Sequence, residues 1–102
     1  MTALLVLNYD VHDDDLLHTY REVAAPVILG SSGQLVTSTD STHHLGEGDT
    51  RGGTHTVVLA YADVAEALAR YESTEYRALL EQRLAATTPR AAFVVEATLP
   101  ST

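Results

Sequence analysis

Two hydrophobic repeats alternate along the chain, and their order is the feature that most limits the folds available to it. Strands repeat every two residues and helices about every 3.6 residues. A helical repeat lies between the first two strand-like segments, and another lies between the last two. The strand-like segments are Ala3 to Val11, Gln34 to about Glu47, Thr54 to Tyr61 and Ala91 to Ala97. The sequence therefore predicts the order strand, helix, strand, strand, helix, strand.

Start and stop signals frame both helical segments. The acidic run 13–15 provides an N-cap and a negative first turn for an apolar stripe over 16–28, and Gly30 ends it. Asp63 opens the second helical segment, with Glu66 at capping-box spacing.

The second helical segment is interrupted and then continues. Ser73 and Thr74 break and restart it, and a further apolar stripe follows, running from Tyr76 to Leu84. We expect Pro89 to close this stretch, because proline is common just beyond the end of a helix.

This order is the split βαβ pattern, a ferredoxin-like α+β fold. It gives a four-stranded antiparallel sheet with both crossover helices on one face. The other face is then bare, and Leu4, Val6 and either Val57 or Val58 would point into water. An apolar sheet face needs a second layer, and a second copy of the chain is the simplest source. We therefore expect a homodimer built as an α+β barrel.

Length and composition bound the remaining possibilities. We expect residues 1–98 to form one domain and residues 99–102 a loose tail, since 102 residues suit a single domain. A net charge of −8 argues against nucleic acid and membrane partners, which favour basic surfaces. The N-terminal stretch lacks the basic region of a signal peptide, so a cytoplasmic location is expected.

The residue types that are missing remove whole classes of chemistry. There is no lysine, which excludes a Schiff base on a lysine side chain. There is no cysteine, which excludes thiolate catalysis, disulfides and iron–sulfur ligation. No spacing matches a metal-site signature, so we expect neither a metal nor any other cofactor.

Several short motifs occur in a characteristic order over about residues 3–97. They are Tyr20-Arg21 with Pro26 further along, Gly33, Glu47-Gly48-Asp49, and the stretch from Val57-Val58-Leu59 through Tyr71 to Ser73-Thr74-Glu75-Tyr76. In these the chain resembles a bacterial family of domains of unknown function within the dimeric α+β-barrel superfamily. That superfamily also holds cofactor-free antibiotic-biosynthesis monooxygenases, small polyketide cyclases and muconolactone isomerases. The resemblance implies a secondary-metabolite substrate.

The chain departs from the family pattern where a pocket would be lined. It has Thr50 after the Gly-Asp pair, where an aromatic residue is common, and Ala60 near the end of the third strand, where an acid is frequent. It also has Thr39-Asp40-Ser41 in place of a basic residue and two glycines.

Asp10 is the leading candidate for a catalytic acid or base. It shares a strand face with Asn8, opposite Tyr9 and Val11. If Tyr9 meets the helices, Asp10 points into the barrel formed with the partner, where an apolar cavity would raise its pKa. The alternatives are a solvated acid at the end of a strand, or a salt bridge to an arginine.

Three strand ends carry histidine and are expected at one edge of the sheet. These positions are His12, His43 or His44, and His55. A hairpin centred near residues 49–50 would set His44 opposite His55, so the pair could relay a proton. The alternative is that these side chains face different sides, since a bulge changes strand parity. His18 lies off the apolar stripe and is expected in solvent.

One pocket per protomer is expected, either between sheet and helices or in the shared barrel. The tyrosines are expected mostly in the core, with one hydroxyl available to the pocket. Ser-His-Asp catalysis has weak support, because no G-x-S-x-G elbow is present. The glycine-rich loop over 46–53 is interpreted as a long hairpin loop that could act as a lid or dimer arm. The residues expected to bind the substrate are Asn8, His12, Tyr20, Thr56 and Val58.

The leading functional hypothesis is a cofactor-independent enzyme acting on a small, largely apolar metabolite. Proton transfer by Asp10, with His44 or His55 nearby, would serve cyclisation, isomerisation or elimination. The alternatives are a non-catalytic protein that binds or shields such a metabolite, a cofactor-free monooxygenase, and a dimer with only a structural role.

Overall fold

The computed structural model describes residues 2–48 and 52–97. The elements follow the predicted order, with the second helical segment divided into two helices. They are β1 (Thr2–Val11), α1 (Asp14–Leu29), β2 (Gln34–Thr39), β3 (His55–Tyr61), α2 (Val64–Tyr71), α3 (Thr74–Ala86) and β4 (Thr87–Ala97).

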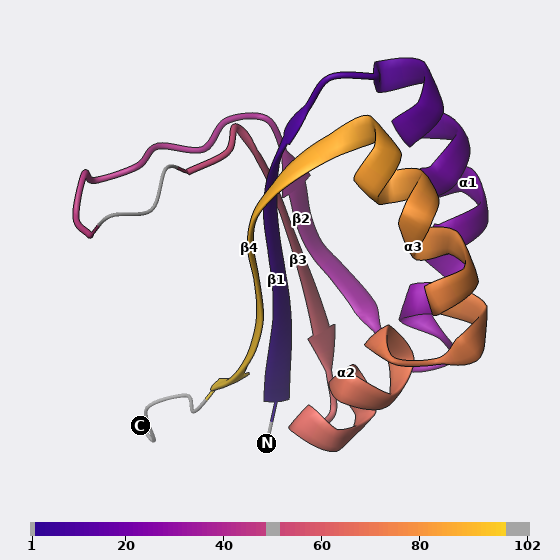
Figure 1. Cartoon of the computed structure of the whole chain (residues 1–102). Coiled ribbons are helices and arrows are strands. Elements are labelled where there is room, and N and C mark those ends of the chain that lie inside the picture. The colour runs from indigo at the N-terminus through magenta and orange to yellow at the C-terminus, as the bar shows by residue number, and fades with distance from the viewer. Residues whose placement is uncertain (1, 49–51, 98–102) are drawn as a thin grey trace.

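The four strands form one sheet in the order β2-β3-β1-β4, and every neighbouring pair is antiparallel. All three helices lie on one face of it, so the molecule has two layers (Figure 1). This confirms the ferredoxin-like α+β fold. None of the helices in the described part of the chain is long and apolar enough to cross a membrane.

Alternation along β1 determines which side chains meet the helices. Leu5, Leu7 and Tyr9 are buried beneath the helical layer. On α1, Leu17, Tyr20, Ala24 and Ile28 are buried, and their spacing is that of one helix face. The core therefore lies between the inner sheet face and α1 with α3, as the two hydrophobic repeats predicted.

The predicted caps are present. The Asp13 carboxylate accepts a hydrogen bond from the Leu16 amide, and the Asp63 carboxylate accepts one from the Glu66 amide. Gly30 ends α1 with a φ of +62°, a conformation that strongly favours glycine. Ser73 caps α3, which explains why the helical repeat restarts there.

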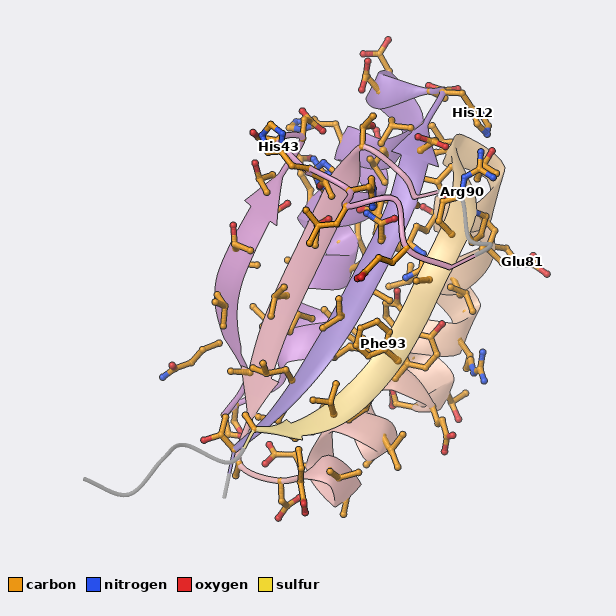
Figure 2. The ribbon with its side chains drawn as sticks, turned by 90° about the vertical axis from the view of Figure 1, so that its left-hand side faces the viewer. His12, His43, Glu81, Arg90 and Phe93 are labelled. Atoms are coloured by element: carbon orange, nitrogen blue, oxygen red, sulfur yellow. The ribbon has the colours of Figure 1, made fainter. Side chains whose placement is uncertain are left out.

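The outer face of the sheet is apolar and carries no helix. Phe93 projects from the middle of β4 on this face (Figure 2), and its side chain is 49% exposed. Register places Val6 between Val58 and Phe93, and Leu4 beside Val95. The expected bare face is confirmed, with Val58 on it and Val57 on the helix side.

The second strand is shorter than the sequence suggested. It ends at Thr39 rather than near Glu47, and residues 40–48 and 52–54 form an arm that projects away from the helices (Figure 1). The Thr39 hydroxyl accepts a hydrogen bond from the Ser41 amide, which turns the chain out of the sheet. Gly46 and Gly48 both have positive φ, which further interrupts extended pairing.

The last strand begins earlier than predicted, at Thr87, and Pro89 lies inside it. Helix α3 does end shortly before Pro89, at Ala86, but Pro89 itself lies within a strand because β4 is at the sheet edge, where a missing amide proton is tolerated. Pro89 pairs with Tyr9 directly after a register shift. The predicted loose tail, residues 99–102, lies outside the described residues.

Candidate active site

A cavity of about 150 Å³ lies between the inner sheet face and helices α1 and α3. Its walls are mainly apolar side chains from β1, β3 and α1, including Leu7, Leu59 and Ala24. Leu35 and Ser38 on β2 also line it and are exposed, so the cavity opens at this edge of the sheet. The predicted pocket between sheet and helices is therefore present.

A polar cluster centred on His55 stands at the open side. The His55 side chain is buried, and its Nδ1 lies 2.5 Å from a carboxylate oxygen of Asp40. Its Nε2 lies 3.0 Å from the Ser38 hydroxyl and 2.6 Å from a guanidinium nitrogen of Arg21. Ser38 and Arg21 themselves line the cavity.

The partners of His55 determine where its proton lies. A guanidinium can only donate, so Nε2 must accept the hydrogen bond from Arg21. Nδ1 then carries the proton and donates it to Asp40. That hydrogen bond is the main cause that lowers the pKa of the Asp40 carboxyl below its usual value of 3.8. The result is a neutral imidazole whose basic nitrogen contacts two residues of the cavity lining, Arg21 and Ser38, and which is oriented by a carboxylate as in a catalytic dyad.

A second polar cluster stands at the closed side of the cavity. The Tyr20 and Tyr76 hydroxyls are 2.6 Å apart, and Arg83 donates to the Tyr76 hydroxyl at 3.1 Å. All three residues are buried and line the cavity. Burial raises the pKa of both tyrosines, with the adjacent phenol raising that of Tyr20 further, so both stay protonated.

Asn8 lies on the outer face of the sheet, as predicted, but it does not line the cavity. Its amide nitrogen donates to the Gly53 and His55 carbonyls and to the Thr56 hydroxyl, and its oxygen accepts from the Gly53 amide. Gly53 packs so closely on the Tyr9 backbone that no side chain fits there. Asn8 and Thr56 therefore fasten the end of the arm to β1.

Asp10 also lies away from the cavity, on the face expected for it. Its carboxylate accepts a hydrogen bond from Arg90 at 2.8 Å and another from the Thr54 amide. The Arg90 hydrogen bond is the main reason that the pKa of Asp10 is lowered. The expectation of a raised pKa was wrong, because an arginine brought close by the register shift in β4 pairs with this carboxylate.

The histidines do not converge at one point. The His44 imidazole is hydrogen bonded to the Gly53 carbonyl on the arm, while His55 faces the helix side. His43 projects from the arm and His12 follows β1 at the top of the sheet (Figure 2). His18 is exposed beside Glu22, as predicted. The shortened β2 explains this, because residues 43 and 44 are not in the sheet.

Of the residues expected to bind a substrate, only Tyr20 lines the cavity. Thr56 and Val58 point to the outer face, because they alternate with Val57 and Leu59. Within residues 2–48 and 52–97, no group of three or more acidic or histidine side chains is placed to hold a metal ion.

Sequence reasoning missed five residues of the two polar clusters at the cavity. They are Arg21, Ser38, Asp40, Tyr76 and Arg83. Two signals were available: Ser38 and Asp40 sit two residues apart at the end of a strand, and Arg83 follows Tyr76 by two helical turns.

These features together define a ferredoxin-like α+β domain with a cavity under its helices. The chain belongs to the family described as Domain of unknown function (DUF1330), whose profile matches residues 2–98. No curated protein sequence matched the chain.

Solved structures share the fold at low sequence identity. The RPA0582 protein of unknown function from Rhodopseudomonas palustris is 21% identical, with a TM-score of 0.65 over 97% of this chain and 83% of that one. SnoaB, a cofactor-independent oxygenase from Streptomyces nogalater, is 12% identical, with a TM-score of 0.62 over 97% and 95%. A dimeric ferredoxin-like protein of unknown function from Thermobifida fusca is 13% identical, with a TM-score of 0.59 over 93% and 90%.

Proposed function

We propose that this protein is a cofactor-independent enzyme that moves a proton on a small, largely apolar carbonyl compound in the cytoplasm. The observation that carries the proposal is the Asp40–His55 pair, which contacts Arg21 and Ser38 in the lining of an apolar cavity. A neutral imidazole fixed in one tautomer by a carboxylate is the usual form of a general base.

The proposed step needs only the groups at the cavity entrance. The substrate carbonyl takes the hydrogen bond that Arg21 now gives to Nε2 of His55. The freed Nε2 then removes a proton from the carbon next to the carbonyl, and the electron pair of that bond moves toward the oxygen as an enolate. Arg21 stabilises the enolate, and Asp40 stabilises the imidazolium.

The fate of the enolate decides the outcome. Return of the proton to another carbon gives an isomer, loss of a leaving group gives elimination, and attack on a second carbonyl gives cyclisation. The Ser38 hydroxyl, 3.0 Å from Nε2, can carry the proton between the imidazole and the substrate. SnoaB is described as a cofactor-independent oxygenase, which supports chemistry without a cofactor on this fold.

The test follows proton exchange on a simple probe, 1-phenylpropan-2-one, in D2O. Proton NMR measures how fast the protons next to the carbonyl are lost with the wild type and with His55→Gln. Removal of a general base costs about 100-fold or more in rate. His18→Gln is the matched control, because His18 is exposed on α1 and away from the cavity.

Equal exchange rates with the wild type and His55→Gln would contradict the proposed base. If the probe binds the wild type but exchanges no faster than in buffer, the protein is instead a binding or shielding protein.

We also propose that the chain acts as a homodimer joined through the outer sheet face. Phe93 and Val95 are exposed there beside the apolar strands β1 and β3, and the arm projects on the same side (Figures 1 and 2). The Thermobifida fusca protein of similar fold is described as dimeric. A partner copy offers a matching apolar face, which is the layer that this sheet lacks.

A further inference from the structure

Arg83 is a buried cation without an acidic partner among the described residues. It is 5% exposed, and the ion pairs in this part of the chain involve other groups. Its neighbours are all tyrosines: the Tyr76 hydroxyl is 3.1 Å away, the centre of the Tyr9 ring is 6.0 Å from the guanidinium carbon, and Tyr20 and Tyr71 are also close. A buried charge is costly unless another charge balances it, so this position is suited to an anion.

The two tyrosine hydroxyls beside Arg83 have one more proton than they have hydrogen-bond acceptors. Tyr76 accepts from Arg83, and one of the two hydroxyls donates to the other. Whichever way that bond runs, one phenolic proton has no acceptor among the hydrogen bonds of the described residues. The guanidinium of Arg83, which lines the cavity, has five N–H groups and so adds further donors beside those used by Tyr76 and Tyr71. Several donors and no acidic acceptor thus meet at the closed side of an apolar cavity.

We propose that the substrate is an apolar acid whose carboxylate binds Arg83 together with Tyr20 or Tyr76. This inference rests on the proposed function, because it assigns the substrate class of the same cavity. The carboxylate supplies the missing negative charge and accepts the spare phenolic proton. A bond between a guanidinium and a carboxylate is stronger at a buried site than in water, and Arg83 is buried.

The cavity dimensions fit a short acid. A cavity of about 150 Å³ holds a single benzene ring. The ring of Tyr9 lies between the two polar clusters, 5.2 Å from the His55 ring and 6.0 Å from the guanidinium carbon of Arg83. An acid anchored at Arg83 can therefore present the carbon atoms beyond its carboxylate to His55.

The experiment compares two probes that differ only in their polar group, phenylacetate and 2-phenylethanol. Calorimetry measures both dissociation constants for the wild type, Arg83→Met and Arg77→Met. Arg77 is the matched control, because it is exposed on the same helix and stacks on Tyr71 outside the cavity. A charged hydrogen bond changes affinity by about 10- to 100-fold.

We expect the wild type and Arg77→Met to prefer phenylacetate by at least about 10-fold, and Arg83→Met to bind both probes equally. Tyr20→Phe and Tyr76→Phe provide independent variants, and at least one of them should weaken phenylacetate binding while leaving 2-phenylethanol unchanged. Together they decide the question if circular dichroism shows that Arg83→Met is unfolded, and an undiminished preference for the acid in both would refute the anion site.

Two other results would overturn the inference. If the wild type binds both probes equally, or if Arg83→Met keeps the preference for the acid, the anion site is refuted while the cavity stands. If neither probe binds the wild type, the cavity is not a ligand site, and the proposed function fails with it.

Discussion

Asn8 offers a sharp test of how the arm is fastened to the sheet. Replacing it with alanine removes hydrogen bonds of 2.6 to 3.1 Å to Gly53, His55 and Thr56. The Gly53 carbonyl keeps its bond from His44, but the buried Gly53 amide loses its acceptor. The orphaned Gly53 amide costs about 1–3 kcal/mol, and the lost bonds to the His55 carbonyl and the Thr56 hydroxyl add about 1 kcal/mol each. We therefore expect Asn8→Ala to lose about 3–5 kcal/mol of unfolding free energy.

Urea denaturation at one fixed protein concentration measures this loss. Thr56→Val is the matched control, because it removes the hydroxyl bonds to Asn8 and Thr42 but leaves the Gly53 bonds in place, so it should cost only about 2 kcal/mol. Asn8→Asp keeps the acceptor for the Gly53 amide but turns a carboxylate oxygen toward two carbonyl oxygens. The loss of unfolding free energy in this variant should therefore become smaller at acid pH, where the carboxylate is protonated. A loss below about 0.5 kcal/mol for Asn8→Ala would refute this reasoning.

Three further predictions concern other parts of the molecule. Arg90 lowers the pKa of Asp10, so the stability from Asp10 is present above its unfolded pKa of 3.8 and lost as pH falls through the lower folded value. In urea titrations, Asp10→Asn should therefore be less stable than the wild type at about pH 6 and equally stable at about pH 2. A difference in unfolding free energy that stays the same at both pH values would exclude the ion pair. Phe93→Glu should reduce the mass in light scattering from twice 11.0 kDa to 11.0 kDa, while Leu84→Glu on the helix side leaves the dimer intact. Ala24→Leu should fill the cavity and abolish phenylacetate binding in calorimetry, whereas Ala65→Leu on exposed α2 should not; binding retained by Ala24→Leu would count against the cavity.

The fold followed from the sequence because its signals are local. Alternation along 3–11 and the helical stripe over 16–28 each depend on neighbouring residues, and so do the caps at Asp13 and Asp63. The two errors, at the end of β2 and at Pro89, occur where position in the sheet overrides local pattern. Pro89 in particular is tolerated only because β4 is at an edge, which no local signal reveals.

The site was harder to predict because it is assembled from distant residues. Asp40 reaches His55 because the β2–β3 register pairs Thr39 with Thr56 and so brings the next residue of each chain segment together, and this register follows an irregularity between Leu35 and Thr37. Arg83 lies on a helix whose other charged residues are exposed. The pattern of charged residues along this helix therefore does not distinguish a buried guanidinium from a solvated one. Asp10 was placed on the correct face, but its partner Arg90 depends on a register shift.

The central claim is that the ligand site lies under the helices rather than on the outer sheet face. The most direct test is a titration of 15N-labelled protein with phenylacetate, followed by amide NMR. The account predicts that the largest shifts occur at Leu7, Ala24 and Leu59, which line the cavity. Shifts confined to the outer face around Asp10 and Val58, or no shifts at all, would contradict it.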